Sequence, residues 1–211
     1  MSLSQTLLEA RLLRLAGLAL VLASVDCSSA LGIEDASCDP ALSECHASKA
    51  SDAVQSSPLC EEYCDSVLAN CQGAFGVYVG RATCLSVCRL LPEGGVGDTH
   101  VNSVRCRLHQ AQLAAEVDEP GVHCPGAGPG GDALCGSNCD GLCTLMLGAC
   151  RVFDSEEACQ ADCRSVPDQN GFNISQSAGN SLQCRLWHAS AASQADVPHC
   201  VHASGSAPCT N

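Results

Sequence analysis

The sequence predicts a mainly α-helical protein in which two tandem three-helix modules are stapled by disulfides. Nineteen of the 211 residues are cysteine, a density typical of disulfide scaffolds. Three phenylalanines, two tyrosines and one tryptophan leave little for a core of large side chains. The motif C-x3-C-x6-C occurs twice, over residues 60–71 and 139–150. Because its cysteines recur four and then seven residues apart, they fall on one face of an α-helix.

Residues 1–26 have the features of a secretory signal peptide. Arg11 and Arg14 supply a positive segment, and the apolar stretch that follows, 15–25, is too short to span a bilayer. We therefore expect an exported protein, and an oxidising compartment would allow its cysteines to pair.

Two ways of processing this signal are open. Cleavage after Ala23 would leave a small residue at the position that an ordinary signal peptidase requires. The segment 22–27 also resembles the end of a bacterial lipoprotein signal, which implies a lipid on Cys27, although Asp26 stands where a small residue is expected. Lipidation would anchor the chain to a membrane of the cell envelope, and simple cleavage would release it outside the cell.

Residues 27–58 are expected to form a flexible N-terminal tether. Cys38 and Cys45 are close enough in sequence to close a small local disulfide loop. From residue 46 to residue 58 the chain is rich in Ala, Ser and Asp and shows no periodicity, which is typical of a linker.

The rest of the chain divides into two cysteine-rich helical repeats, 59–135 and 136–211. Both contain Asn-Ser-x-x-Cys-Arg-Leu, at 102–108 and 180–186, and both carry a later His-Cys pair. Each repeat holds eight cysteines, which are Cys60, Cys64, Cys71, Cys84, Cys88, Cys106, Cys124 and Cys135 in the first, and Cys139, Cys143, Cys150, Cys159, Cys163, Cys184, Cys200 and Cys209 in the second.

With Cys38 and Cys45 the repeats account for an even number of cysteines and leave Cys27 alone. An unpaired cysteine in an exported protein needs an explanation, which lipidation would supply, as would loss with the signal peptide if cleavage follows Ala30. The repeated pattern resembles cysteine-rich repeats of uncharacterised secreted proteins and lipoproteins of Gram-negative bacteria. That resemblance implies an exported location and no mechanism.

Each repeat has room for three helices, the first of which carries the C-x3-C-x6-C motif. The second helices are expected around 83–90 and 155–165, and the third from Asn102 to about Glu116 and from Asn180 to about Gln194. Asp154 or Ser155 can cap one of the second helices, and the two asparagines are suitable N-caps for the third.

Paired C-x3-C motifs on successive helices resemble helical hairpins stapled by two disulfides. That resemblance implies the bridges Cys60–Cys88, Cys64–Cys84, Cys139–Cys163 and Cys143–Cys159. The third helices would then be tied by Cys71–Cys106 and Cys150–Cys184, and the terminal loops by Cys124–Cys135 and Cys200–Cys209. Eight cysteines allow 105 connectivities, so other pairings remain open.

Histidines are the first candidates for chemistry. His188, His199 and His202 gather in the second repeat, and three imidazoles can bind a divalent metal such as Zn or Cu. The first repeat offers only His109 and His123. The competing interpretation puts the histidines of the His-Cys pairs on turns beside a disulfide, where they would hydrogen-bond the backbone.

Composition and missing motifs argue against several function classes. A formal charge of −13 with Lys49 as the single lysine argues against nucleic-acid binding. The chain contains no G-x-S-x-G, no H-E-x-x-H, no C-x-x-C and no C-x-x-C-H, so we expect no enzyme activity and no cofactor. The sequence predicts a binding or structural module of the cell envelope whose partner, a protein or another envelope component, is unknown. The alternative is a metal-binding or redox protein that uses the three histidines.

Overall fold

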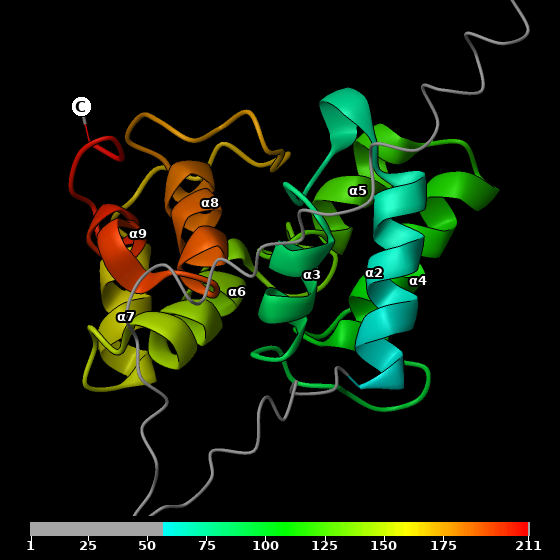
Figure 1. Ribbon diagram of the computed structural model, residues 1–211, viewed down its shortest axis with the longest axis horizontal. Helices are drawn as coiled ribbons and strands as arrows, with labels where there is room; N and C mark the ends of the chain where they lie inside the picture. Colours follow the sequence, from blue (N-terminus) through cyan, green and yellow to red (C-terminus); the bar gives the residue numbers. More distant parts are fainter. Residues whose placement is uncertain (1–56, 211) are drawn as a thin grey trace, which may run out of the picture. The chain divides into compact units, whose positions relative to one another are not determined.

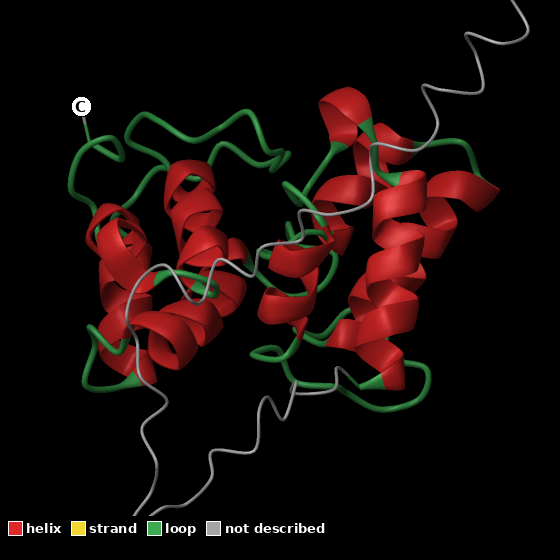
Figure 2. Cartoon of the chain, in the orientation of Figure 1, coloured by secondary structure: helices red, strands yellow, loops and turns green. Residues whose placement is uncertain are grey.

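The computed structural model describes residues 57–210, which belong to one compact unit of the chain. The expected signal peptide, the lipidation site at Cys27, nearly all of the expected tether, and Cys38 and Cys45 lie outside the described residues. Residues 57–210 form helices and loops and contain no strand, so the predicted mainly helical fold class is confirmed (Figure 2). None of these helices combines the length and the apolar character that crossing a bilayer would need.

The helices follow the two repeats in order (Figure 1). The first repeat contains α2 (Pro58–Asn70), the short 3-10 turn η2 (Gly73–Phe75), α3 (Arg81–Cys88), α4 (Val104–Glu116) and α5 (Pro120–Ala127). The second contains α6 (Asn138–Leu145), the π-helical turn η3 (Met146–Cys150), α7 (Glu156–Cys163), α8 (Leu182–Ala192) and α9 (Asp196–Ala203). The three expected helices of each repeat are present, and each repeat adds a fourth short helix, α5 or α9.

Serine side chains begin several of these helices. The hydroxyl groups of Ser103 and Ser181 each accept a hydrogen bond from the backbone N–H three residues later, at 3.2 Å, and so cap α4 and α8. The expected caps at Asn102 and Asn180 are therefore wrong by one residue. Ser155 caps α7 in the same way, which confirms one of the two caps expected for this helix, Asp154 or Ser155.

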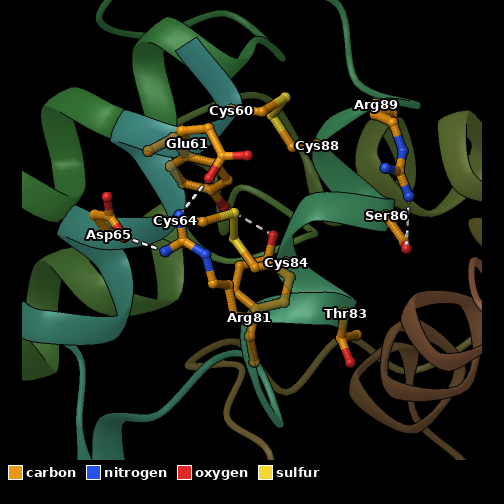
Figure 3. Close-up of a disulfide and its surroundings, with 12 residues drawn as sticks. Cys60, Glu61, Cys64, Asp65, Arg81, Thr83, Cys84, Ser86, Cys88 and Arg89 are labelled. Carbon is orange, nitrogen blue, oxygen red and sulfur yellow. Dashed lines mark hydrogen bonds and ion pairs between the residues drawn. A yellow bond between two sulfur atoms is a disulfide. The ribbon is translucent and has the colours of Figure 1, made fainter. Parts of the chain in front are cut away.

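Two disulfides staple the first helix of each repeat to the second, and Figure 3 shows the pair in the first repeat. The four bridges match those implied by the hairpin resemblance and are Cys60–Cys88, Cys64–Cys84, Cys139–Cys163 and Cys143–Cys159. Arg81 at the start of α3 pairs with Glu61 and Asp65 on α2 across the same contact. The C-x3-C spacing places two sulfurs one helical turn apart on facing helices, which is what a double staple needs.

The other four bridges correct the expected pairing. They are Cys71–Cys124, Cys106–Cys135, Cys150–Cys200 and Cys184–Cys209, with Cα–Cα distances of 5.5, 5.7, 5.3 and 5.6 Å. The expected Cys71–Cys106, Cys150–Cys184, Cys124–Cys135 and Cys200–Cys209 are wrong. The cause is the fourth helix, which packs against the third and brings its own cysteine to the end of the first helix. The cysteine of the third helix then pairs with the last cysteine of the repeat.

A buried arginine anchors the chain where the first repeat ends. Arg107 is fully buried and donates to the carbonyl oxygens of Gly128, Ser103 and Pro129 at 2.9, 3.1 and 3.0 Å, and also to Asn102. Burial lowers the pKa of this guanidinium, and four acceptors offset part of its lost hydration. Arg185, its counterpart, pairs instead with Asp162 at 2.6 Å. Repetition of this arginine therefore serves the fold in both repeats.

The two repeats are joined by packing and hydrogen bonds. Helix α3 contacts α8. The amide of Ile174 donates to the carbonyl of Gly76 at 2.9 Å, and the Gln194 side chain donates to the Thr83 hydroxyl at 2.7 Å. The loop before α8 and the turn after it thus contact the first repeat, and a cavity lies between the repeats.

Candidate metal site

The three candidate histidines converge between α8 and α9. His188 lies on α8, and His199 and His202 lie on α9, three residues apart and so on one face of that helix. Their ligating nitrogens lie within 4.8 Å of one another. The His188 ring centroid is 5.2 Å from that of His199 and 4.7 Å from that of His202. The structure therefore brings all three sequence-predicted residues together.

Disulfides hold the two helices that carry these side chains. Cys200, beside His199, ties α9 to Cys150 at the end of the first helix of the repeat. Cys184, one helical turn before His188, ties α8 to Cys209. The close approach of the imidazoles thus rests on covalent links as well as on the packing of α8 against α9.

Hydrogen bonds assign the tautomers of two of the rings. The Nε2 of His188 lies 3.2 Å from the carbonyl oxygen of Ser177, which can only accept, so a neutral His188 carries its proton on Nε2. Its Nδ1 is then an acceptor, and it lies 2.9 Å from the Nδ1 of His199, which donates. The lone pair of His188 faces the cluster, while a backbone carbonyl orients the ring from behind, as is usual for a metal-ligating histidine.

His202 supplies the least satisfied group of the cluster. Its Nδ1 is buried and has no hydrogen-bond partner. A buried polar atom without a partner costs roughly 1–3 kcal/mol, which a bound ion can offset. Of the three histidines, His202 is thus the one with a buried ring nitrogen that lacks a bonding partner.

The electrostatics keep two rings neutral. Burial lowers the pKa of His188, and the nearby His202 and His199 lower it further against the opposing bond from Ser177. Burial, followed by the proximity of His202, lowers the pKa of His199. Neutral imidazole is the form that binds metals, so near neutral pH no proton has to leave these two rings first.

The first repeat provides an internal comparison. At the positions of His188, His199 and His202 it carries Gln110, His123 and Gly126. The Nδ1 of His123 lies 2.8 Å from Gln110 Oε1, so this histidine is satisfied by an amide and no third donor is present. The expectation that the histidines of the His-Cys pairs lie on turns and bond the backbone is wrong, because both lie on helices and bond side chains.

Other candidate ligands are already engaged. Among residues 57–210 a second group, Cys184, His188 and Cys209, is close enough for a metal, but its two cysteines form a disulfide. Sequence reasoning found the three histidines and missed their neighbour Trp187, and it also missed Gln110, the partner of His123 in the first repeat. The ring of Trp187 makes T-shaped contacts with those of His188 and His199, with centroids 4.7 and 5.9 Å apart. Aligning the repeats position by position reveals the glutamine, whereas no sequence signal indicates the indole contact.

Comparison with known proteins adds no relative. No protein-family model, no curated protein sequence and no solved structure matches this chain.

Proposed function

We propose that this protein is an exported, disulfide-stapled binding module whose second repeat binds one divalent transition-metal ion, Zn²⁺ or Cu²⁺, through His188, His199 and His202. The observation that carries the proposal is the convergence of three imidazoles within 4.8 Å, together with the buried, unpartnered Nδ1 of His202. Of the two functions that the sequence leaves open, this geometry favours metal binding over a purely structural role.

The donor chemistry selects the class of metal. Imidazole suits Zn²⁺, Cu²⁺ and related ions, whereas Mg²⁺ and Ca²⁺ require oxygen ligands. Within residues 57–210 no carboxylate belongs to this histidine group. Three neutral donors leave the full charge of the ion uncompensated, which favours a water or an anion at the fourth position.

The distance between His188 and His199 suits a tetrahedral ion after a small adjustment, and the ligating nitrogen of His202 lies within 4.8 Å of both. Zinc–nitrogen bonds of about 2.0–2.1 Å place ligating nitrogens about 3.3 Å apart. The Nδ1 atoms of His188 and His199 lie 2.9 Å apart and would separate by a few tenths of an ångström. Their mutual hydrogen bond would be exchanged for two bonds to the metal, and the proton on Nδ1 of His199 would move to its Nε2.

The cellular location forms part of the same proposal. Eight disulfides within residues 57–210 are consistent with an oxidising, exported environment. We place the module at the cell envelope, held by a lipid on Cys27 when that cysteine becomes the first residue. Intact mass of the mature protein tests this: a diacyl or triacyl increment on a chain that begins at Cys27 supports anchoring, and an unmodified chain that begins after Ala23 contradicts it.

Calorimetric titration of the oxidised, metal-free full chain with Zn²⁺ tests metal binding. We expect one high-affinity site, and we expect His202→Ala to weaken it at least about 100-fold, since loss of an outer-shell partner alone costs 10–100-fold. His188→Gln is the second variant, because it recreates the amide–imidazole pair that the first repeat already contains and so preserves the hydrogen bond to His199.

The matched control is His123→Ala, which removes the equivalent histidine of the first repeat and should leave the affinity unchanged. Equal Zn²⁺ affinity in the wild type and in His202→Ala, with all disulfides intact, would refute the proposal and leave a structural or protein-binding module.

A further inference from the structure

A second group of candidate metal ligands shares one residue with the histidine site. Cys184 and His188 lie one turn apart on the same face of α8, and Cys209 reaches them from the segment that follows α9. The two sulfurs and a ring nitrogen of His188 all lie within 4.8 Å of one another. His188 therefore belongs both to this sulfur group and to the cluster of three histidines.

The oxidation state of the two cysteines decides which of these groups can hold an ion. In the structure they form the Cys184–Cys209 disulfide, and cysteine binds metals as the thiolate. Reduction would turn the pair into two thiols, and a zinc ion that displaces their protons would gain two anionic sulfur ligands beside His188. Two thiolates would neutralise the charge of a divalent ion, which three neutral imidazoles leave uncompensated.

The segment that carries Cys209 makes few buried contacts. Cys184 is 0 % and Cys209 is 1 % exposed, so a reductant reaches their sulfurs only after a local opening. Cys184 lies within α8, whereas residues 206–210 form no helix and Cys209 alone is buried among them. Segments of this kind open at a lower free energy than the core. Such an opening would expose the bridge to a thiol reductant while Cys150–Cys200 still holds α9.

We infer that Cys184–Cys209 is a redox switch of the metal site: its reduction by a thiol turns the three-histidine site into one in which Cys184, Cys209 and His188 bind Zn²⁺. The inference deepens the proposed function and rests on it for the oxidised state, although the reduced site needs only His188 of the three histidines.

The chemistry of the switch is a thiol–disulfide exchange followed by metal binding. Two thiol molecules supply two electrons and two protons. The bond between the cysteine sulfurs breaks through a mixed disulfide, each sulfur becomes a thiol, and the two reductant molecules join in a disulfide. Binding of Zn²⁺ then releases the two thiol protons to solvent.

The first repeat contains the same bridge without the shared ligand. Cys106–Cys135 occupies the equivalent position, and Gln110 follows Cys106 by one turn, as His188 follows Cys184. Amide oxygen suits Ca²⁺ and Mg²⁺, whereas imidazole suits Zn²⁺. Within residues 57–210 neither cysteine of this bridge belongs to a group that could hold a metal. Cys106–Cys135 is therefore a matched internal control.

Reduction in a glutathione buffer with and without Zn²⁺ tests the switch on the full chain. The variant His202→Ala is used, because its oxidised form should bind Zn²⁺ only weakly, and a chelator fixes the free Zn²⁺ concentration. Acid quenches the exchange, and alkylation after denaturation and zinc removal labels the free thiols, which peptide mapping assigns to each bridge.

Zinc that binds the reduced form shifts the equilibrium towards reduction. At a free Zn²⁺ concentration about 100 times the dissociation constant of the reduced site, reduction of Cys184–Cys209 should become about 100-fold more favourable. Cys106–Cys135 should not respond to Zn²⁺. Equal shifts at the two bridges, or no shift at Cys184–Cys209, would overturn the inference.

A further substitution and a spectroscopic measurement test the assigned ligands. His188→Gln gives the second repeat the residue that the first has at this position, so the effect of Zn²⁺ on Cys184–Cys209 should disappear; an undiminished effect would contradict the role of His188. Co²⁺ bound to the partly reduced chain should give the intense charge-transfer absorption of a cobalt–thiolate bond, and Co²⁺ bound to the oxidised chain should not. Absence of this band while Cys184–Cys209 is reduced would overturn the thiolate site.

The outcomes separate this inference from the proposed function. Zn²⁺ titration of the oxidised wild type tests the three histidines, whereas the shift at Cys184–Cys209 in His202→Ala tests the two thiolates. Zinc binding to the oxidised chain without that shift would overturn the switch and leave the proposed function. The shift without zinc binding to the oxidised chain would support the thiolate site and overturn the proposed function.

Discussion

Removal of the Cys71–Cys124 bridge should be among the more destabilising disulfide losses in the chain. The bridge closes a loop of 53 residues, and the remaining bridges shorten the path between its ends only to roughly 40 residues. In the chain-entropy model a loop of this length contributes about 4 kcal/mol. Cys143–Cys159 closes 16 residues, which the remaining Cys139–Cys163 bridge shortens to roughly 8, so it contributes about 2.5 kcal/mol.

Paired substitutions expose this difference. Cys71→Ala with Cys124→Ala should lower the free energy of unfolding in guanidinium by about 4 kcal/mol, and the melting temperature by roughly 8–16 °C for a chain of this size. The same experiment on Cys143 and Cys159 should give the smaller loss.

Thiol labelling tests the pairing itself. Cys71→Ala with Cys124→Ala should release no new thiol, whereas Cys71→Ala with Cys106→Ala should leave reactive thiols at Cys124 and Cys135. The reverse pattern, located by peptide mapping after alkylation, would refute the connectivity and the role given to α5.

Three further predictions follow from buried groups. Burial raises the pKa of Tyr78 to about 12 and raises that of Tyr63 well above 10.0, and these are the chain's two tyrosines, so phenolate absorbance should stay absent until well above pH 10. Because both folded-state pKa values exceed the unfolded value, the stability that is linked to these two tyrosines is fully present below pH 10 and is lost as the pH rises towards 12. Ordinary titration of the tyrosines near pH 10 would contradict this. Arg107→Met should lower the free energy of unfolding, measured in denaturant, by about 3 kcal/mol, since it leaves buried carbonyl oxygens without a donor. Arg185→Met should lower it clearly less, because its partner Asp162 is partly exposed. Equal losses would contradict the assigned contacts. The lowered pKa of His188 makes the metal-free protein lose stability as the pH falls below about 6.5, and His188→Gln should flatten that decline in melts between pH 7 and 5; an unchanged slope would argue against the lowered pKa.

The sequence predicts local geometry well and chain topology less well. The four hairpin bridges could be predicted because paired C-x3-C motifs on successive helices resemble doubly stapled helical hairpins, and this spacing puts two cysteines one turn apart on a helix face. The other bridges depend on where α5 and α9 lie. Both helices contain proline and are short, and α5 also carries two glycines, so propensity gives no sign of them and tertiary packing decides.

The sequence could likewise predict only part of the candidate metal site. His199 and His202 are separated by one helical turn and share a helix face, and the duplicated His-Cys pair draws attention to them. The bond from His188 to the Ser177 carbonyl and the unpartnered nitrogens of His202 and Trp187 depend on how α8, α9 and the preceding loop pack. The cavity is likewise built from both repeats, so no pattern within one repeat could indicate it.

The most direct test of the central claim is anomalous diffraction at the zinc edge from crystals of the oxidised protein grown with Zn²⁺. The account predicts one strong anomalous peak between α8 and α9, bound by imidazole nitrogens of His188, His199 and His202 at about 2.0–2.1 Å. A peak bound by other residues, or none at this cluster while surface sites are occupied, would contradict it.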